Sequence, residues 1–252
     1  MVMHSFLLIG QSNMAGRGFL NDAVPVDTTH IHVLRNGRWQ KMFRPVNPDR
    51  AFSGSCLAES FCEAYAKKHG VEVGIIPCAD GGTSLDQWKE GGLLYDHAVY
   101  QARLAQRTST IAGVLWHQGE ADVSVWGYTT YRERFEKMMA AFRRDLGLDD
   151  VPFILGGLGD FLKDFPSQET LRTNYVHVNA ALREIADNNE MTGFASAEGL
   201  SGNPDNLHFS ADGLYNFGLR YFEGFEKLRD PNKEFPDKSD EDSAIRSAME
   251  LL

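Results

Sequence analysis

The stretch FLLIGQSNMAGRG, residues 6–18, decides how this chain begins to fold. Its apolar run, residues 6–9, has the composition of a short buried β-strand. The run stops at Gly10, and Ser12 follows between two amide side chains. A buried strand that ends on a polar, glycine-flanked serine predicts a functional turn at the edge of a sheet.

Similar apolar runs recur along the chain and alternate with helical patterns. Strands are predicted at 5–9, 72–77, 111–116, 151–155 and 193–197, and helices near 54–69, 94–108, 128–146, 168–189 and 212–228. Near-continuous apolar strands separated by helices are typical of parallel strands covered on both faces. The sequence therefore predicts an α/β protein, a three-layer α/β/α sandwich around a mostly five-stranded parallel sheet.

Two regions depart from this alternation. Residues 17–52 are rich in Asn, Asp, Arg and Pro, and we interpret them as an excursion over the functional face of the sheet. Residues 230–252 begin polar and Pro-punctuated and end in a short amphipathic pattern. We expect a single domain over residues 1–229 and a polar C-terminal tail over 230–252, in which a short helix can form.

Composition excludes some classes of function. The 252 residues are 42% hydrophobic and 24% charged, which is ordinary for a globular protein. A net charge of −10 argues against binding to nucleic acid or to an anionic membrane surface. The sequence does not indicate an oligomeric state.

The cysteines and the N-terminal sequence predict a cytoplasmic protein. Three cysteines, Cys56, Cys62 and Cys78, are too few and too odd in number for a disulfide framework. The start has no basic region, and its apolar run is too short for a signal peptide. No run reaches the roughly 18 apolar residues of a membrane span. A mature form that had lost its leader would look the same.

Each predicted strand is followed by a polar, glycine-containing turn. The turns read GQSN, CADGGTS, HQGEAD, GGLGD and EGLSGNPDNLHFSADG in chain order. The carboxyl ends of parallel strands meet at one edge of a sheet, and ligands bind outside that edge. The five turns therefore predict one assembled site.

Ser12 needs a base if it is to act as a nucleophile, because a serine hydroxyl is otherwise unreactive. The stretch DNLHF supplies Asp205 and His208, three residues apart. Such pairs are common by chance, but this one lies on the predicted edge. Three strand widths are roughly 14 Å, which residues 198–209 can span. We expect Asp205 to orient His208, and His208 to reach Ser12.

Acyl transfer also needs donors aimed at the developing oxyanion. In the usual strand order the first strand lies between the second and third, so their turns flank Ser12. One turn offers the backbone N–H groups of Gly81 and Gly82, and the other offers the side-chain amide of Gln118. Both features also have structural explanations, as a simple strand-to-loop turn and as a loop-bracing amide.

The blocks GQSNMAGRG, PCADGGTSLDQW, LWHQGEAD and DNLHFSADG resemble the ordered motifs of the SGNH-hydrolase superfamily. Within it they are similar to the branch of sialate O-acetylesterases and acetylxylan esterases. The similarity runs from Gly10 to about Phe222, and the tail beyond about residue 230 has no counterpart. The resemblance implies a flavodoxin-like sheet and a serine esterase that removes O-acetyl groups from carbohydrates without a cofactor.

The resemblance also implies roles for individual residues. Ser12 is the expected nucleophile, His208 the base and Asp205 its orienting partner. The expected oxyanion donors are the N–H of Ser12, Gly82 in preference to Gly81, and the side chain of Gln118.

Several further residues are candidates for support of the site or for substrate binding. Gln11, Asn13, Gly81 and Glu120 are expected to support the site. Glu120 either braces the third turn or acts as a second carboxylate near His208. Arg17 and Arg50 are candidates for lining a sugar site. Trp88 is a candidate for stacking on a sugar ring, and it is equally well explained as a core anchor.

Other catalytic motifs fit less well. The G-x-S-x-G elbow of α/β-hydrolases, a P-loop and a dinucleotide fingerprint are all absent from the sequence. His117, Glu120 and Asp122 have metal-ligand spacing, but no second pair accompanies them, so we predict no metal.

Two other functions stay open from sequence. One is a non-catalytic carbohydrate-binding module on the same scaffold. The other is an SGNH lipase or thioesterase, for which residues 17–52 are too polar to suggest an acyl groove.

Overall fold

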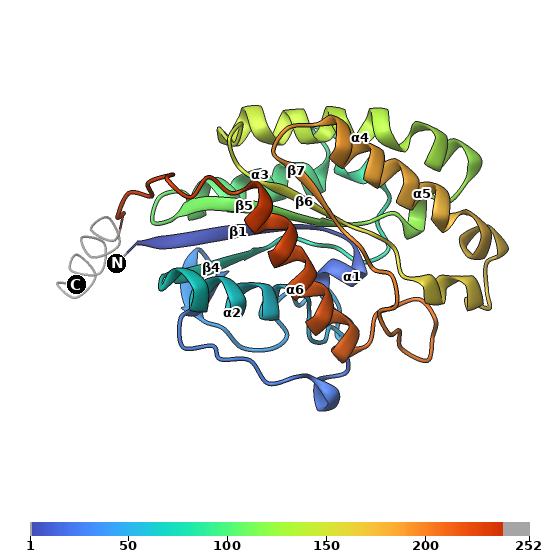
Figure 1. Ribbon diagram of the computed structural model, residues 1–252, viewed down its shortest axis with the longest axis horizontal. Coiled ribbons are helices and arrows are strands. Elements are labelled where there is room, and N and C mark those ends of the chain that lie inside the picture. The colour runs from blue at the N-terminus through green and yellow to red at the C-terminus, as the bar shows by residue number, and fades with distance from the viewer. Residues whose placement is uncertain (1, 239–252) are drawn as a thin grey trace.

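A computed structural model describes residues 2–238 and shows, within that range, one seven-stranded sheet (Figure 1). The strand order is β3-β2-β4-β1-β5-β6-β7, with all neighbours parallel except the antiparallel pair β2 and β3. The strands are β1 (Met3–Gly10), β2 (Ile31–Arg35), β3 (Arg38–Lys41), β4 (Glu72–Pro77), β5 (Thr110–His117), β6 (Phe153–Gly156) and β7 (Thr192–Ala195). As predicted, the first strand lies between the 72–77 and 111–116 strands.

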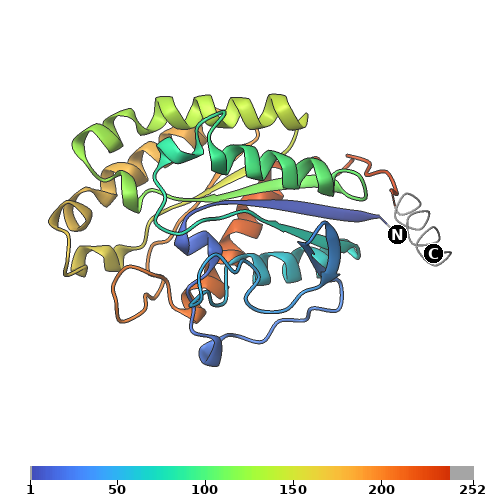
Figure 2. The same cartoon turned by 180° about the vertical axis from the view of Figure 1, so that it is seen from behind.

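Helices cover both faces of the sheet. They are α1 (Ser12–Ala15), α2 (Ala58–His69), α3 (Leu93–Ala105), α4 (Val125–Leu146), α5 (Glu169–Asn188) and α6 (Ala211–Leu228). Helices α3, α4 and α5 lie on one face and α2 and α6 on the other, as the two opposite views show (Figures 1 and 2). The predicted three-layer sandwich is confirmed.

Local sequence signals set the ends of the helices. The Ser124 side chain accepts a hydrogen bond from the Gly127 N–H at the start of α4, and Ser210 accepts one from the Gly213 N–H at the start of α6. Helix α4 ends at Gly147, which adopts the left-handed conformation that glycine tolerates best. The two serine caps fix where loops of the carboxyl edge end, and Gly147 begins the loop that leads into β6.

Strand β1 contributes to the core on both faces. Phe6 and Leu8 pack into the cluster that includes α2 and α6, while Leu7 and Ile9 pack into the cluster under α3, α4 and α5. All four side chains are fully buried. Burial of each contributes about 1.5–3 kcal/mol. This anchoring makes β1 a rigid support for the turn at its carboxyl end.

The end of β1 is set by close backbone packing. Gly10 has a φ of 132°, and a Cβ atom there would lie 2.1 Å from the carbonyl oxygen of His117. The next residue, Gln11, donates its N–H to that same oxygen at 2.9 Å. Only glycine allows this approach, so the chain turns there and Ser12 is held at the edge of the sheet.

The five predicted strands are present, but the sequence analysis missed two more. Strands β2 and β3 lie inside residues 17–52, so that segment is not only an excursion over the functional face. They are short, and β3 is mostly exposed, so the hydrophobic signal is limited to the three buried apolar residues of β2. A usable signal was the Asn36-Gly37 turn between them, where both residues have positive φ as in a two-residue hairpin.

The described part of the C-terminal tail packs at the amino end of the sheet. The ring of Phe235 lies 3.9 Å from that of His4, and Lys233 forms a 2.8 Å ion pair with Asp150. Residues 239–252, which include the amphipathic pattern, lie outside the described residues.

Two expectations concerned the oxidation state of the cysteines and the presence of a membrane span. Cys56, Cys62 and Cys78 are all buried, and all are free thiols. Within residues 2–238, no helix combines the length and the apolar character that crossing a bilayer requires.

Candidate active site

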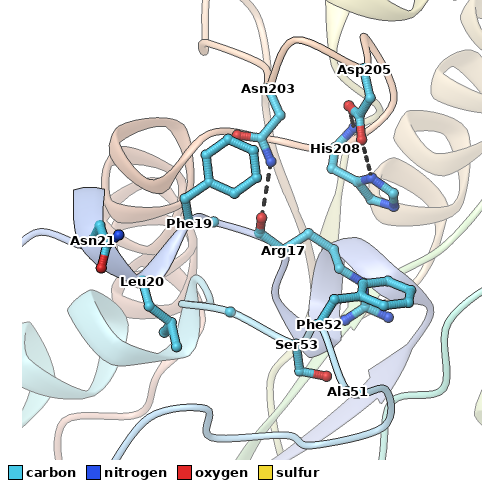
Figure 3. Close-up of a pocket in the computed structure, with 12 residues that line it drawn as sticks. Arg17, Phe19, Leu20, Asn21, Ala51, Phe52, Ser53, Asn203, Asp205 and His208 are labelled. Carbon is cyan, nitrogen blue, oxygen red and sulfur yellow. Dashed lines mark hydrogen bonds and ion pairs between the residues drawn. The ribbon is translucent and has the colours of Figure 1, made fainter.

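Ser12, His208 and Asp205 form a continuous chain of hydrogen bonds. The Ser12 Oγ lies 3.0 Å from His208 Nε2, although the two residues are 196 positions apart. His208 Nδ1 lies 2.7 Å from Asp205 Oδ2 (Figure 3). The predicted meeting of these three side chains is therefore confirmed.

The loop that carries Asp205 orients both of its carboxylate oxygens. Asp205 Oδ1 accepts the backbone N–H groups of Leu207 at 2.9 Å and His208 at 3.0 Å, which leaves Oδ2 for the imidazole. Burial alone would raise the pKa of Asp205, but the hydrogen bonds from His208 and Leu207 outweigh it and hold the pKa below its usual value. The charged carboxylate favours the tautomer with its hydrogen on Nδ1, so Nε2 can accept from Ser12.

Asn13 fastens the His208 loop on both sides of the histidine. Its Nδ2 donates to the Leu207 carbonyl at 3.2 Å, and its Oδ1 accepts the Phe209 N–H at 3.1 Å. The same Nδ2 donates to Glu120 Oε1 at 2.6 Å. Glu120 thus braces the first and third turns through Asn13, whereas the side-chain partners of His208 are Asp205 and Ser12.

Two backbone N–H groups remain as donors near Ser12. The Ser12 N–H opens α1, where a helix offers it no partner. The Gly81 N–H is taken, because it donates to Asp49 Oδ2 at 2.8 Å. Within the described residues, the N–H of Gly82 donates no hydrogen bond, and a Cβ atom there would meet nothing within 4 Å. Between the two glycines, this geometry favours Gly82.

Gln118 does not have the position that the sequence analysis predicted. Its Nε2 donates to the Thr83 carbonyl at 3.1 Å and to Asp122 Oδ2 at 2.7 Å, and its side chain is fully buried. Its Oε1 accepts from the Tyr131 hydroxyl at 3.0 Å. A carboxylate is a stronger acceptor than a neutral carbonyl, so Asp122 captures the amide. The prediction of Gln118 as an oxyanion donor is wrong in this structure, where it braces two turns.

Gln11 has a similar bracing position. It is buried, and its Oε1 lies 3.5 Å from the N–H of Gly119, which donates to it. The contact joins the first turn to the third, in line with the predicted supporting role.

Arg17 lines the site but its charge is already paired. Its Nη1 and Nη2 donate to the two oxygens of Asp49 at 2.9 and 2.7 Å. Burial would raise the pKa of Asp49, but the hydrogen bonds from Arg17 and Ser53 outweigh it and lower the pKa. The guanidinium also lies 5.2 Å from the centre of the Phe52 ring (Figure 3).

The prediction that Trp88 stacks on a sugar is wrong. Trp88 is fully buried, its Nε1 donates to Thr83 Oγ1 at 3.1 Å, and its ring meets Trp116 edge to face. It is the core anchor that the sequence analysis weighed as the other explanation.

A pocket of about 500 Å³ opens beside His208 (Figure 3). Its wall comes from three loops and is lined by Arg17, Gly18, Phe19, Leu20, Asn21, Ala51, Phe52, Ser53, Gly54, Asn203, Asp205 and His208. The sequence analysis missed Phe19, Phe52 and Asn203. The two phenylalanines were a weak signal, because the same segment also contains Trp39 and Phe43.

Comparison with known proteins agrees with this geometry. Residues 2–227 match the family described as carbohydrate esterase, sialic acid-specific acetylesterase. The chain belongs to this family. This esterase is 27% identical over 244 residues to a probable carbohydrate esterase of Arabidopsis thaliana, a match that covers 85% of the chain and 86% of the relative. It is also 27% identical over 132 residues to a probable 9-O-acetyl-N-acetylneuraminic acid deacetylase of Escherichia coli K12, covering 40% of each.

Solved structures share the fold of the esterase. A protein from Arabidopsis thaliana superposes with a TM-score of 0.80 at 24% identity, covering 90% of this chain and 99% of that one. A carbohydrate acetylesterase from Xanthomonas citri gives a TM-score of 0.67 at 19% identity, covering 90% of this chain and 56% of that one. At these identities the likeness establishes the fold.

The residues with metal-ligand spacing are buried in the esterase: His117, Glu120 and Asp122. His117 is fully buried, its Nε2 lies 3.1 Å from the Gly157 carbonyl, and its Nδ1 lies 3.9 Å from Glu120 Oε1. Asp122 Oδ1 accepts from Arg134 Nη2 at 2.9 Å. Across residues 2–238, no group of three or more His, Cys, Asp or Glu side chains is arranged to hold a metal ion.

Proposed function

We propose that this esterase removes O-acetyl groups from carbohydrates through an acetyl-enzyme intermediate, with Ser12 as nucleophile, His208 as general base and Asp205 as the orienting carboxylate. The observation that carries the proposal is the pair of contacts at 3.0 Å and 2.7 Å that joins these three side chains. The family match supports the ester class, and the named relatives support a carbohydrate as the alcohol.

In the first step the Ser12 Oγ bonds to the acetyl carbonyl carbon while its proton passes to His208 Nε2. The carbonyl oxygen becomes an oxyanion, which the N–H groups of Ser12 and Gly82 can stabilise. His208 then gives its proton to the sugar oxygen as the C–O bond breaks, which leaves acetyl-Ser12. In the second step water gives a proton to His208 Nε2 and attacks the acetyl carbon, and His208 then returns that proton to Ser12 Oγ as the acyl–oxygen bond breaks and acetate leaves.

Hydrolysis of 4-nitrophenyl acetate, together with acetate release from a panel of acetylated sugars, tests the proposal. Ser12→Ala should lower kcat by about 10³-fold or more, because no other group can form the acyl-enzyme. An alkyl phosphonate ester should label the wild type on Ser12 and leave the variant unlabelled. Near-wild-type turnover by Ser12→Ala would end the covalent route.

The same experiment separates the two rival functions. A non-catalytic binding module would neither hydrolyse the aryl acetate nor react with the phosphonate. A lipase or thioesterase would turn over 4-nitrophenyl octanoate faster than the acetate, whereas we expect the acetate to be favoured.

A further inference from the structure

The pocket beside His208 contains a single arginine, and its charge is unavailable to a ligand. Arg17 and Asp49 have side chains that are only 4% and 5% exposed, and their two parallel hydrogen bonds use both terminal nitrogens. Arg17 Nη1 also donates to the Gly16 carbonyl. If Arg17 turned to a substrate carboxylate, Asp49 would keep its hydrogen bonds from Ser53 and from the Gly81 N–H but would lose the bidentate cation that balances its buried charge, which is unfavourable.

The neighbouring Arg50 is more exposed, with 42% of its side chain accessible, but it is also paired. Its Nη1 lies 2.8 Å from Asp80 Oδ1, and its Nη2 donates to the Gly81 carbonyl at 2.9 Å. Of the aspartate and glutamate side chains, Asp205 is the one that lines this pocket within the described residues. Among the described residues that line the pocket, no cation is free to pair with an anionic ligand.

The accessible part of the pocket wall is aromatic and aliphatic. Phe52 is 70% exposed, Phe19 53% and Leu20 48%, which is unusual for side chains of this size. Phe19 and Phe52 come from separate loops and flank Arg17 in the pocket (Figure 3). Asn21 adds an exposed, uncharged amide. Clustered exposed rings with a few neutral polar groups are typical of a ligand site.

We propose that this pocket binds the neutral pyranose ring of an acetylated sugar, with the C–H face of the ring on Phe52, and that it selects against sugars that carry a carboxylate. The inference rests on the proposed esterase function and specifies its substrate class. A pyranose has an apolar C–H face whose burial on a phenyl ring removes both surfaces from water. A carboxylate would lose its hydration here and meet the negative charge of Asp205 without a compensating cation.

A matched pair of substrates tests the selectivity. The pair is a methyl glucoside and a methyl glucuronide, each acetylated once on the same hydroxyl, so that they differ only in the neutral or charged group at C6. Acetate release by the wild type should give a kcat/KM at least tenfold higher for the glucoside at low ionic strength. Added salt should narrow the ratio, because it screens the repulsion.

Variants at Phe52 test the stacking face. Phe52→Ala should raise KM for the acetylated glucoside about tenfold with kcat changed less than about threefold, and Phe52→Trp should restore a low KM. Tyr100→Ala is the matched control, because it removes an equally exposed ring, 72% exposed, on α3 and outside the pocket lining. It should leave both constants unchanged.

The outcomes distinguish this inference from the proposed function. If the wild type fails to hydrolyse 4-nitrophenyl acetate, the esterase proposal itself falls. If it hydrolyses the aryl acetate but uses the glucuronide as well as or better than the glucoside, only the selectivity for neutral sugars is overturned. A Phe52→Ala enzyme with unchanged KM for the glucoside would remove Phe52 as the stacking face.

Discussion

Asp205 and His208 stand three residues apart on one turn of this chain, and His117 and Glu120 stand three residues apart on another. The first pair is joined at 2.7 Å and continues to Ser12. The second pair is 3.9 Å apart and buried. A histidine and a carboxylate at the same spacing are therefore hydrogen-bonded in the first pair and not hydrogen-bonded in the second.

The difference comes from which partners reach each group first. Backbone N–H groups occupy one oxygen of Asp205 and aim the other at His208. Glu120 Oε1 instead accepts from Asn13, and the ring of His117 is enclosed by the rings of Phe209 and Phe217, each 5.6 Å away.

The pKa of the enclosed imidazole is set by the same surroundings. Burial lowers the pKa of His117 in spite of the opposing effect of Glu120, so its ring is held neutral. The spacing of residues in the sequence indicates a candidate histidine–carboxylate pair. The contacts around the two side chains determine whether the histidine can transfer a proton.

The largest expected effect is at His208. His208→Asn should lower kcat for 4-nitrophenyl acetate by about 10³-fold or more, as Ser12→Ala does, because the two act as one unit. The loop should stay folded, since its anchors to Asn13 are backbone groups. Steady-state kinetics with a urea unfolding curve checks both points. An active His208→Asn enzyme would contradict the role of His208 as the general base, and the His208–Asp205 pair would then be no more catalytic than the His117–Glu120 pair.

Asp205→Asn should have the next largest effect, about 10²-fold in kcat. The Asn carbonyl can keep the two backbone hydrogen bonds, but a neutral amide no longer stabilises the imidazolium and permits the wrong tautomer. The measurement is kcat for 4-nitrophenyl acetate across pH. If activity were fully retained, Asp205 would not be the orienting carboxylate, and Glu120 would have to be reconsidered.

His4 extends the comparison to an enclosed histidine at the other end of β1. Burial, together with repulsion from Arg229 and His69, lowers its pKa to about 4 from 6.5. The unfolded chain takes up this proton near pH 6.5 and the folded chain does not. The contribution of His4 to the free energy of unfolding should thus be fully present above pH 6.5. It should fall by up to about 3 kcal/mol as the pH approaches 4.

Urea unfolding of the wild type and of His4→Gln between pH 7 and 4 measures this contribution. The variant should lose less stability on acidification than the wild type. His30→Gln removes an exposed imidazole and is the control. An equal acid loss in His4→Gln and the wild type would contradict the assigned role of burial.

The smallest effect is expected at Glu120. Glu120→Gln keeps an oxygen that can accept from Asn13, so kcat should fall less than about tenfold. The weaker neutral hydrogen bond accounts for the loss. The measurement is kcat for 4-nitrophenyl acetate, compared between the Glu120→Gln and Asp205→Asn enzymes under the same conditions. A loss as large as that of Asp205→Asn would mean that Glu120 acts on the chemistry and is more than a brace.

The sequence alone was sufficient for features that depend on local pattern and chain order. The apolar runs predicted five parallel strands and the position of β1, and the glycine turns predicted one edge as the site. The β2–β3 hairpin was missed because its strands are short and partly exposed, so that the Asn36-Gly37 turn was its main signal.

Gln118 and Trp88 show where sequence reasoning stops. Both stand in blocks typical of the family, and both carry groups suited to the predicted roles. Their orientation depends on Asp122 and Thr83, which reach them only in the folded chain. The sequence does not show which acceptor a side-chain N–H will bind when several acceptors come close only in the folded chain.

By itself, the sequence determined the layers, the edge that carries the site and the three side chains that meet there, because hydrophobic periodicity and parallel topology place strand ends together. The tertiary structure alone decided which donors and charges are free: Gly82 and not Gly81, and an Arg17 neutralised by Asp49. Whether a donor or a charged side chain is free to bind a ligand depends on its distance from other groups and on its burial. Both are defined only after segments far apart in the sequence have packed against one another.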